Sequence, residues 1–435
     1  MHKLKKVFFN KKILIYGLGL TGNTSFDYLK NNNNVSVYDD YIKNINIKKF
    51  KNYFLKKNEI LKTTFDHIVI SPGINSKKCK LKIFLAKNTK KICTDLDVFY
   101  TNNFKNKIIT VTGTNGKSTT VKLISDIFIN SGKDARTVGN IGKSILSEKK
   151  IRKNTIFVIE ASSYQIEYSK YFKSNYSILL NINPDHIERH GNFKSYLDAK
   201  LKLFYNKSNK DFALFDKKNK IISKAIKKNK IKCKILNVSA SINKKYINFI
   251  LNNHMMNKNN LQNLSFVFKV CEKFKIKKKK IIGGINKFQG LKYRQQILHD
   301  TKKLLIINDS KSTSFSSTTN LITSYNNIFW ILGGESKKDD KFFFKKNKKR
   351  NIQAYIFGRN KNFFIKKLNK KINFQTFSSL KKALQKVIVD VKSSKTNFKK
   401  TILFSPCAAS FDEFKNFEER GAYFNFLIKS VKKKL

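Results

Sequence analysis

The stretch with the most specific chemical character is a glycine loop that carries a lysine and a serine. It covers residues 112–120 and reads Thr-Gly-Thr-Asn-Gly-Lys-Ser-Thr-Thr, between an apolar segment typical of a strand and one typical of a helix. Backbone N–H groups of such a loop can surround the phosphates of a nucleoside triphosphate. Lys117 would neutralise the β- and γ-phosphates, and the Ser118 hydroxyl would hold Mg²⁺. The strict pattern GxxxxGK[ST] is not met, because Val111 stands where it requires the first glycine.

Two side chains that could hold a divalent metal follow the next two expected strands. Glu160 comes directly after the apolar segment 155–159, and His186 lies shortly after the segment 177–180. A single glutamate or histidine is usually a solvated or internally satisfied residue. Two of them at strand ends near a phosphate loop favour a site for Mg²⁺, which prefers oxygen ligands and keeps several waters.

A second glycine loop lies near the N-terminus. Residues 17–22 read Gly-Leu-Gly-Leu-Thr-Gly after an expected strand, and Asp39 stands 22 positions beyond Gly17 at the end of the next strand. This GxGxxG pattern permits a tight turn and a close approach of the backbone to phosphate. It predicts a nucleotide-binding loop, with a plain glycine turn in a parallel sheet as the alternative. Another tight loop, 71–74, follows a third strand at the edge where open sheets bind ligands.

Apolar segments of strand length precede these loops and recur in the last third of the chain. Repeated strand, polar loop and helix units predict an α/β protein with doubly wound, mostly parallel sheets. At about 150 residues per domain, 435 residues suggest three domains. We expect an N-terminal Rossmann-like domain over 1–103, a central P-loop-type ATPase domain over 104–297 and a C-terminal Rossmann-like domain over 298–435. The expected strands are 13–16, 35–38, 67–70, 108–111, 155–159, 177–180, 304–307, 328–332, 354–357 and 401–404.

The charge of the chain is extreme. Lys and Arg number 91 and Asp and Glu 28, which gives a formal net charge of +63. A nucleic-acid binder is one interpretation of this charge. However, only seven of the basic residues are arginines, whose planar fork suits phosphate and guanine, and the lysines spread over the whole length. We therefore interpret the charge as a compositional bias of solvent-facing positions and expect no specific nucleic-acid partner.

Composition also excludes other classes of protein. A hydrophobic content of 40% is too high for a disordered polycation, and no apolar run approaches the roughly 18 residues of a membrane helix. The five cysteines have no CxxC or histidine-paired spacing, which favours a reduced cytoplasm over a disulfide framework. The basic N-terminus precedes only four apolar residues, 13–16, too few for a signal peptide. We expect a cytoplasmic protein with no membrane span.

Three stretches together identify a known family. Residues 111–120 resemble the ATP loop of the Mur ligases, whose signature is GTNGK[ST], and that family also has the variant with one glycine fewer. Residues 17–22 and the long stretch 403–421, Leu-Phe-Ser-Pro-Cys-Ala-Ala-Ser-Phe-Asp-Glu-Phe-Lys-Asn-Phe-Glu-Glu-Arg-Gly, resemble the branch that adds D-glutamate to UDP-N-acetylmuramoyl-L-alanine. The resemblance implies a cytoplasmic, monomeric ligase of peptidoglycan precursor synthesis. In that family a substrate carboxylate attacks the γ-phosphate of ATP, and the amine of the amino acid then attacks the acyl phosphate through a tetrahedral intermediate. ADP and phosphate are released.

The resemblance also implies a role for individual residues. Catalysis would fall to Lys117, Glu160, His186 and Lys200. ATP would be bound by Gly113, Thr114, Asn115, Gly116, Lys117, Ser118, Thr119, Asn260, Asn263, Arg294, Asp309 and Lys311. Mg²⁺ would be held by Ser118, Glu160, His186 and a carbamylated Lys200. The UDP substrate would be bound by Leu18, Leu20, Thr21, Asp39, Asp40, Ser71, Gly73, Asn140, Ser162 and Gln165. D-Glutamate would be bound by Thr313, Lys337, Ser410 and Phe417, since a cation and hydroxyls suit a dicarboxylate.

Lys200 is the residue that composition could never select, because the chain has 84 lysines. The family carries a carbamylated lysine at the matching position. Carbamylation replaces an ammonium by an anion that can ligate Mg²⁺, so it inverts the local charge. Three residues depart from the family's HNxxN and HRxE motifs: Asn259 stands in place of the first histidine, Tyr293 in place of the second and Gln296 in place of the glutamate.

Two alternatives remain at this point. One is a related ligase that adds another amino acid, or a folylpolyglutamate synthase. The chain has no DNPR-type loop, which a ligase adding a diamino acid would carry, and a folylpolyglutamate synthase would lack the domain that contains Gly17 and Asp39. The other is a cationic binding protein with no enzymatic activity, which would cluster its arginines and lack the ordered motifs.

Overall fold

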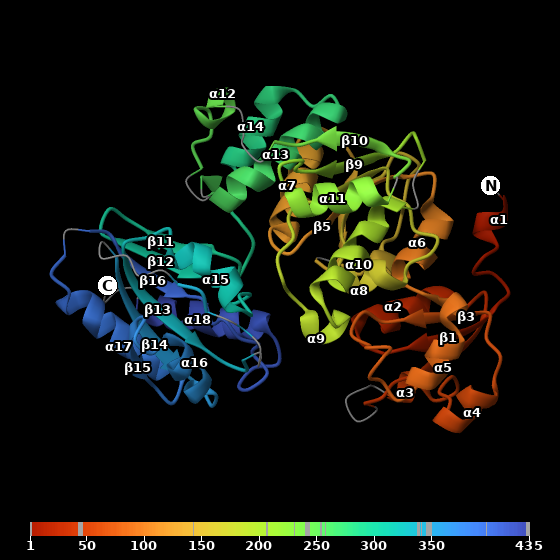
Figure 1. The fold of residues 1–435 in the computed structure, drawn as a ribbon, viewed down its shortest axis with the longest axis horizontal. Coiled ribbons are helices and arrows are strands. Elements are labelled where there is room, and N and C mark those ends of the chain that lie inside the picture. The colour runs from red at the N-terminus through yellow and green to blue at the C-terminus, as the bar shows by residue number, and fades with distance from the viewer. Residues whose placement is uncertain are drawn as a thin grey trace. The chain divides into compact units, whose positions relative to one another are not determined.

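Two compact units, Met1–Phe288 and Gln289–Leu435, divide the chain. The first runs from red to green in Figure 1 and the second from teal to blue. The structure is a computed structural model. It describes residues 2–41, 47–141, 143–205, 208–229, 231–239, 244–252, 255–256, 258–336, 340, 342–344, 350–396 and 398–431.

The N-terminal sheet has four parallel strands in the order β2-β1-β3-β4. Successive side chains of a strand point to opposite faces. In β1, Ile13 and Ile15 join the core with α2 and α6, whereas Leu14 and Tyr16 join the core with α4 and α5. Both faces are therefore covered, as parallel sheets require. The strands are β1 (Lys12–Tyr16), β2 (Asn34–Tyr38), β3 (His67–Ile70) and β4 (Ile92–Cys93). The helices are α1 (His2–Lys5), α2 (Leu20–Leu29), α3 (Ile47–Phe50), α4 (Lys57–Lys62), α5 (Lys82–Lys87) and α6 (Asp95–Asn103), with a 3-10 turn η2 (Thr89–Lys91).

The second sheet of the first unit has six parallel strands in the order β10-β9-β8-β5-β7-β6. Ile109 and Val111 of β5 pack with α7, α13 and α14. On the other face, Phe157 of β7 lies 4.7 Å from Phe99 of α6, ring centre to ring centre, and this core is continuous with that of β1. The strands are β5 (Lys107–Thr112), β6 (Ala135–Gly139), β7 (Ile156–Glu160), β8 (Tyr176–Leu179), β9 (Phe212–Phe215) and β10 (Lys234–Asn237). The helices are α7 (Lys117–Asn130), α8 (Ser163–Tyr168), α9 (Ile187–His190), α10 (Phe193–Tyr205), α11 (Lys220–Lys228), α12 (Lys244–Ile247), α13 (Lys258–Lys273) and α14 (Lys278–Asn286), with a 3-10 turn η3 (Ile145–Ser147).

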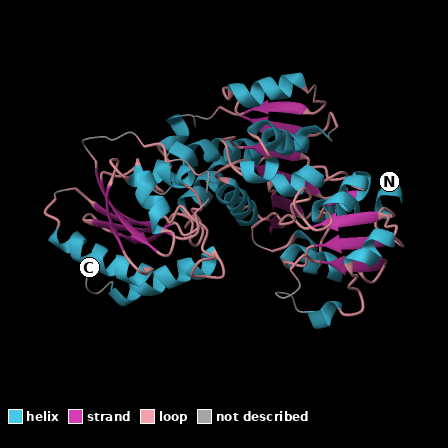
Figure 2. Ribbon diagram, turned by 60° about the horizontal axis from the view of Figure 1, so that its bottom comes forward, coloured by secondary structure: helices cyan, strands magenta, loops and turns pink. Residues whose placement is uncertain are grey.

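The C-terminal unit contains one sheet in the order β11-β12-β16-β13-β14-β15, parallel except for β11. Phe329 and Ile331 of β13 pack against α17 and α18, and Trp330 and Leu332 pack against α15 and α16. Helices flank the strands on both faces (Figure 2). The strands are β11 (Gln296–Asp300), β12 (Leu304–Asn308), β13 (Asn327–Gly333), β14 (Asn351–Phe357), β15 (Asn373–Thr376) and β16 (Lys400–Phe404). The helices are α15 (Phe315–Ile322), α16 (Lys361–Leu368), α17 (Leu380–Ser393) and α18 (Phe417–Val431).

The predicted fold class is confirmed, and all ten expected strands are present with ends shifted by at most three residues. Most of the strands that the sequence did not predict lie at sheet edges: β4, β6, β10, β11 and β15. An edge strand lies beside only one other strand, so its sequence is not a continuous apolar run; β10, for example, is largely exposed. The remaining one, β9, is apolar but only four residues long.

The end of the first unit differs from the domain boundary expected at 297/298. That boundary falls inside β11 (Gln296–Asp300), which pairs antiparallel with β12. Since a strand belongs to the sheet whose hydrogen bonds it shares, the C-terminal unit has to begin before β11, and it begins at Gln289.

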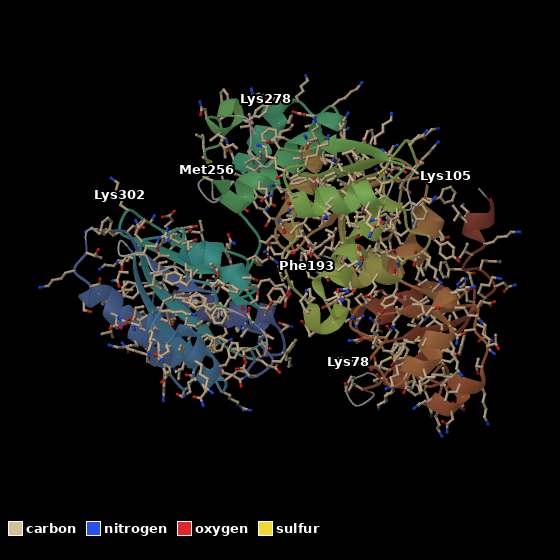
Figure 3. All side chains as sticks on the ribbon, viewed as in Figure 1. Lys78, Lys105, Phe193, Met256, Lys278 and Lys302 are labelled. Atoms are coloured by element: carbon tan, nitrogen blue, oxygen red, sulfur yellow. The ribbon has the colours of Figure 1, made fainter. Side chains whose placement is uncertain are left out.

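Exposed lysines are found around each of the three sheets. Lys78, Lys105, Lys278 and Lys302 are exposed and extend away from the ribbon (Figure 3). Among the described helices, none has the length and apolar character needed to cross a membrane.

Candidate active site

The carboxyl ends of β8, β5, β7 and β6 lie side by side, because these strands are neighbours in the second sheet. The loop 113–116 follows β5 at this edge and leads into α7. Gly113 and Gly116 have φ of +151° and +85°, in the region that favours glycine. A Cβ on Gly116 would lie only 2.5 Å from Nδ2 of Asn263. The structure thus brings Asn263, a residue expected at the nucleotide, against the phosphate loop.

Two lysines converge on one carbonyl oxygen of this loop. Lys117 Nζ donates to Gly113 O and to Thr114 O, both at 2.8 Å. Lys200 Nζ, from α10, donates to the same Gly113 O at 3.0 Å. Two ammonium groups so close together repel each other, and the charge of Lys117 disfavours the charged form of Lys200.

Lys200 is almost completely buried, with 2% of its surface exposed. Its ammonium lies 4.7 Å from the ring centre of Tyr196 and 3.4 Å from the Thr112 hydroxyl. Burial lowers the pKa of Lys200 well below its usual value, and the charge of Lys117 lowers this pKa further. The neutral amine is the form of a lysine that reacts with carbon dioxide, and burial shifts Lys200 toward that form.

A hydrogen-bonded chain of oxygen ligands lies beside the lysines. The Ser118 hydroxyl donates to Glu160 Oε2 at 2.5 Å, and Asn140 Nδ2 donates to Glu160 Oε1 at 3.0 Å. Glu160 ends β7 with 1% of its surface exposed. A buried carboxylate and a hydroxyl at a phosphate loop have the chemistry of a Mg²⁺ site, since Mg²⁺ is usually held by one or two carboxylates together with substrate phosphates.

His186 lies at the same sheet edge but in a more open setting. It begins the short helix α9 with a left-handed φ of +54°. Its Nε2 lies 3.4 Å from Asp185 Oδ2 and its Nδ1 lies 3.7 Å from Glu188 Oε1. Within the described part of the chain, no three His, Cys, Asp or Glu side chains form a metal cage by themselves. His186 follows β8 and Glu160 ends β7 at this edge of the sheet.

The first glycine loop is tightly built. A Cβ on Gly22 would lie 1.8 Å from Gly17 O, so no other residue allows α2 to begin so close to β1. Asp39 accepts a hydrogen bond from the Leu18 N–H at 2.6 Å. Asp40 accepts one from the Tyr16 hydroxyl at 2.8 Å.

The neighbouring loops of the first sheet meet the glycine loop, because β2, β1 and β3 are adjacent. The Ser71 hydroxyl donates to Gly17 O at 2.6 Å. Leu20 is 72% exposed, Thr21 is half-buried, and a Cβ on Gly73 would meet open space. These three positions leave room for a ligand at this edge.

Ser162 and Gln165 form the N-terminal cap of α8. The Ser162 hydroxyl accepts from the Gln165 N–H at 3.2 Å, and Gln165 Nε2 donates to both carboxylate oxygens of Asp95, at 3.3 and 3.2 Å. Burial raises the pKa of Asp95 to about 6. Ser162 and Gln165, which were both expected to bind the UDP substrate, therefore each have a hydrogen-bond partner within the protein.

The expected site residues of the C-terminal unit gather around Phe417. Lys311 Nζ lies 3.9 Å above the Phe417 ring, and the Arg294 guanidinium lies 5.9 Å from it. Asp309 is buried behind them and accepts from the Gln295 N–H at 3.0 Å. Burial raises the pKa of Asp309 to about 7.

The remaining expected residues of this unit lie on the neighbouring loops. Ser410 is buried in the loop after β16, and Thr313 is partly buried in the loop after β12. Lys337 lies outside the described residues. Asn260 and Asn263 are buried on α13, in the first unit.

Of the three residues that depart from the family motifs, the structure describes the side chains of Tyr293 and Gln296. Gln296 Oε1 accepts from the Tyr293 N–H at 3.1 Å and from Asn425 Nδ2 at 3.3 Å. Tyr293 has a left-handed φ of +62°. Gln296 thus serves as an acceptor for the turn that carries Arg294. The side chain of Asn259 lies outside the described residues.

Sequence reasoning did not assign a role to Arg420, which is fully buried. Its guanidinium donates to Ser310 Oγ and O at 3.1 and 2.8 Å, to Ala408 O at 2.9 Å and to Ala409 O at 3.1 Å. Burial lowers its pKa to about 10. Arg420 therefore joins the loops after β12 and β16. The sequence feature that could have identified Arg420 is its place in the stretch 403–421, because the chain has only seven arginines.

Sequence reasoning also missed residues that form hydrogen bonds at or near the phosphate loop. Asn181, after β8, accepts from the Asn115 N–H at 2.9 Å and donates to Asn115 O at 3.0 Å. The Tyr196 hydroxyl lies 3.2 Å from Thr114 Oγ1. His190 is buried with Nε2 3.0 Å from the Ser163 hydroxyl, and burial lowers its pKa to about 4. Such contacts join residues far apart in the sequence, and no local pattern indicates them.

The chain is similar to known proteins of one family. A family model for the Mur ligase middle domain matches residues 111–286. A UDP-N-acetylmuramoylalanine–D-glutamate ligase of Rickettsia bellii is 34% identical over 441 residues, covering 95% of this chain and 96% of the relative. The corresponding protein of Francisella philomiragia is 31% identical, covering 98% of this chain and 99% of the relative.

Solved structures share the fold at low sequence identity. The UDP-N-acetylmuramate–alanine ligase MurC of Thermotoga maritima aligns with a TM-score of 0.54 at 16% identity, covering 98% of this chain and 100% of that chain. The MurF ligase of the same organism, solved in complex with ADP, aligns with a TM-score of 0.56 at 13% identity, covering 99% of each chain. Near full-length identity above 30%, together with this site, shows that the chain belongs to the Mur ligase family.

Proposed function

We propose that the chain joins D-glutamate to UDP-N-acetylmuramoyl-L-alanine in the cytoplasm, at the cost of one ATP, releasing ADP and phosphate. The observation that carries the proposal is the convergence of Lys117 and Lys200 on Gly113 O in the phosphate loop. A nucleotide loop needs one lysine to neutralise phosphate. A second, buried lysine whose pKa is lowered well below its usual value is not needed for that purpose, and it fits a lysine that is converted into a carbamate.

The first unit is suited to the phosphoryl-transfer step. Phosphoryl transfer to a carboxylate needs positioning and charge neutralisation more than covalent help. N–H groups of the loop 113–119 would surround the phosphates, and Lys117 would leave its loop carbonyls to reach the β- and γ-phosphates. Mg²⁺ would neutralise the charge that builds up between the acyl carboxylate and the γ-phosphate, held by Ser118, Glu160, His186 and the Lys200 carbamate.

The other substrates have matching positions. The UDP group would lie at the edge formed by Leu18, Leu20, Thr21, Asp39, Asp40, Ser71 and Gly73, and the muramoyl-alanine part at Asn140, Ser162 and Gln165. Asn260, Asn263, Arg294, Asp309 and Lys311 would contact the nucleotide, and Thr313, Lys337, Ser410 and Phe417 would hold D-glutamate. We assign the UDP substrate to a first domain (1–103), ATP to a second that ends with the first unit at Phe288, and the amino acid to the C-terminal unit, Gln289–Leu435. We propose that the protein acts as a monomer.

The substrate assignment predicts a joint requirement. ADP release should depend on UDP-N-acetylmuramoyl-L-alanine, D-glutamate and Mg²⁺ together, because the acyl phosphate needs the first substrate and turnover needs the amine. A coupled ADP assay across amino acids checks this. L-Glutamate and a diamino acid serve as matched controls, and turnover with either at the rate seen with D-glutamate would contradict the assignment.

Glu160→Gln should raise the Mg²⁺ concentration needed for half-maximal ADP release by roughly tenfold or more, because it keeps the shape of a ligand but removes its charge. Calorimetric titration of Mg²⁺ in the presence of ADP gives a second measurement that does not depend on turnover. Glu59→Gln, at an exposed residue of α4, is the control. Unchanged Mg²⁺ binding in Glu160→Gln would remove Glu160 from the metal site.

A further inference from the structure

The C-terminal unit buries a hydroxyl that joins two loops and that no motif singled out. Thr318 lies on α15 with none of its surface exposed. Three polar groups surround its Oγ1: Ser312 Oγ at 2.5 Å, Ser405 Oγ at 2.6 Å and Cys407 Sγ at 3.1 Å. These three groups belong to two different loops, so Thr318 is the point at which the loops are connected.

The two loops are those that carry the proposed amino-acid site. The loop 309–314 follows β12 and contains Lys311 and Thr313. The loop 405–416 follows β16, the neighbour of β12 in the sheet, and contains Ser410. A change in the spacing of these loops would therefore move the two sides of the site relative to each other.

Counting protons gives the direction of these hydrogen bonds. The Ser405 hydroxyl donates to Asp309 Oδ2 at 3.1 Å. Ser405 has then used its proton and must accept one from Thr318. Thr318 in turn accepts from the Cys407 thiol. It also shares a hydrogen bond with the Ser312 hydroxyl, which lies 2.7 Å from Ser317 Oγ as well. One threonine hydroxyl therefore satisfies groups on both loops in a single arrangement.

We propose that Thr318 is a positioning residue for the amino-acid substrate, because its hydroxyl sets the spacing between the loops 309–314 and 405–416. The proposal rests on the proposed function, since it takes these loops as the D-glutamate site. Valine has nearly the shape of threonine but can neither donate nor accept. It would leave the Ser312, Ser405 and Cys407 groups buried without their shared partner, and the loops would separate or repack to hydrate them.

The test compares Thr318→Val with Thr319→Val on the same helix. The Thr319 hydroxyl only bonds to Phe315 O, at 2.8 Å, one turn earlier. In Thr318→Val the KM for D-glutamate should rise roughly tenfold, which corresponds to the loss of about one buried hydrogen bond. The KM for the UDP substrate, assigned to the first unit, should stay within about twofold. Thr318→Ser, which keeps the hydroxyl, should restore the KM for D-glutamate.

The single tryptophan reports whether the variants are folded. Trp330 is fully buried, and its Nε1 donates to Ser405 O at 2.9 Å. Blue-shifted Trp330 emission therefore shows an intact C-terminal unit around Ser405. If Thr318→Val loses this emission, Ser405→Ala replaces it, because it breaks the same chain between Thr318 and Asp309.

Amide hydrogen exchange separates failure of this proposal from failure of the proposed function. Exchange in both loops should become faster in folded Thr318→Val but not in Thr319→Val, whether or not the protein is a ligase. Exchange unchanged in the loops, or a KM for D-glutamate equal to that of the unaltered protein, would overturn the role of Thr318. An unaltered protein that releases no ADP with D-glutamate would instead overturn the proposed function, and the exchange data would still decide on Thr318.

Discussion

Replacing Lys200 by alanine should lower the rate of ADP release by about a hundredfold to a thousandfold, because it removes the carbamate that we place on Mg²⁺ and the loss of one such charge-stabilising group typically costs that much. Lys200 is buried beside Lys117 and the phosphate loop. A small carboxylic acid such as acetate should partly restore activity, since it can supply an anion in the space that alanine leaves. Steady-state kinetics with and without acetate measure both effects.

A spectroscopic experiment tests the carbamate without turnover. Protein kept in ¹³C-labelled bicarbonate should show a carbamate carbon signal that Lys200→Ala lacks and Lys194→Ala retains, since Lys194 is exposed on the same helix. The lowered pKa of Lys200 fixes the direction of the pH dependence. The neutral amine predominates above this pKa, so the signal should be strongest above the lowered pKa and should disappear as the pH falls through it. Activity of Lys200→Ala close to that of the unaltered protein would remove Lys200 from the site.

Replacing Asp97 by alanine should cost about 3–5 kcal/mol of the free energy of unfolding, because it leaves a group of buried N–H donors without an acceptor. Asp97 lies on α6 and is fully buried. Its Oδ1 accepts from the N–H groups of Lys170, Tyr171 and Phe172 at 2.8, 2.7 and 2.9 Å, and its Oδ2 accepts from the Thr94 N–H at 2.9 Å. The carboxylate thus ties the helix that follows the first sheet to a segment of the second.

Urea unfolding followed by circular dichroism measures this cost. Asp66→Ala is the matched control, because Asp66 is exposed and accepts one backbone hydrogen bond, from Lys12, at 2.8 Å. It should cost no more than about 1 kcal/mol. A similarly small loss in Asp97→Ala would show that the two sheets of the first unit are held together by their shared apolar core alone, in which Phe99 meets Phe157.

Much of the fold follows from short-range patterns. A strand buried on both faces must be apolar at every position, and this made segments such as 328–332 visible in the sequence. An edge strand lacks that requirement, so β6 and β15 were not predicted. Their pairing depends on the neighbouring strands and not on their own side chains.

The residues of the site also differ in how far the sequence alone could identify them. Glycines 17, 22, 113 and 116 could be recognised because a tight turn excludes other residues at those positions, and the structure shows the close contacts responsible. Lys200, by contrast, is one of 84 lysines. Motif similarity could select it, but only the structure shows that it is buried and shares a carbonyl with Lys117.

The sequence by itself therefore determined the α/β class, the phosphate loop and the family, because these depend on residues close together in the chain. Only the tertiary structure decided which polar groups become partners. Glu160 meets Ser118, Asp97 meets three N–H groups of residues 170–172, and Thr318 joins two loops. Each of these contacts depends on how segments far apart in the chain come together, and a polar side chain carries no local sign of the partner that burial will require.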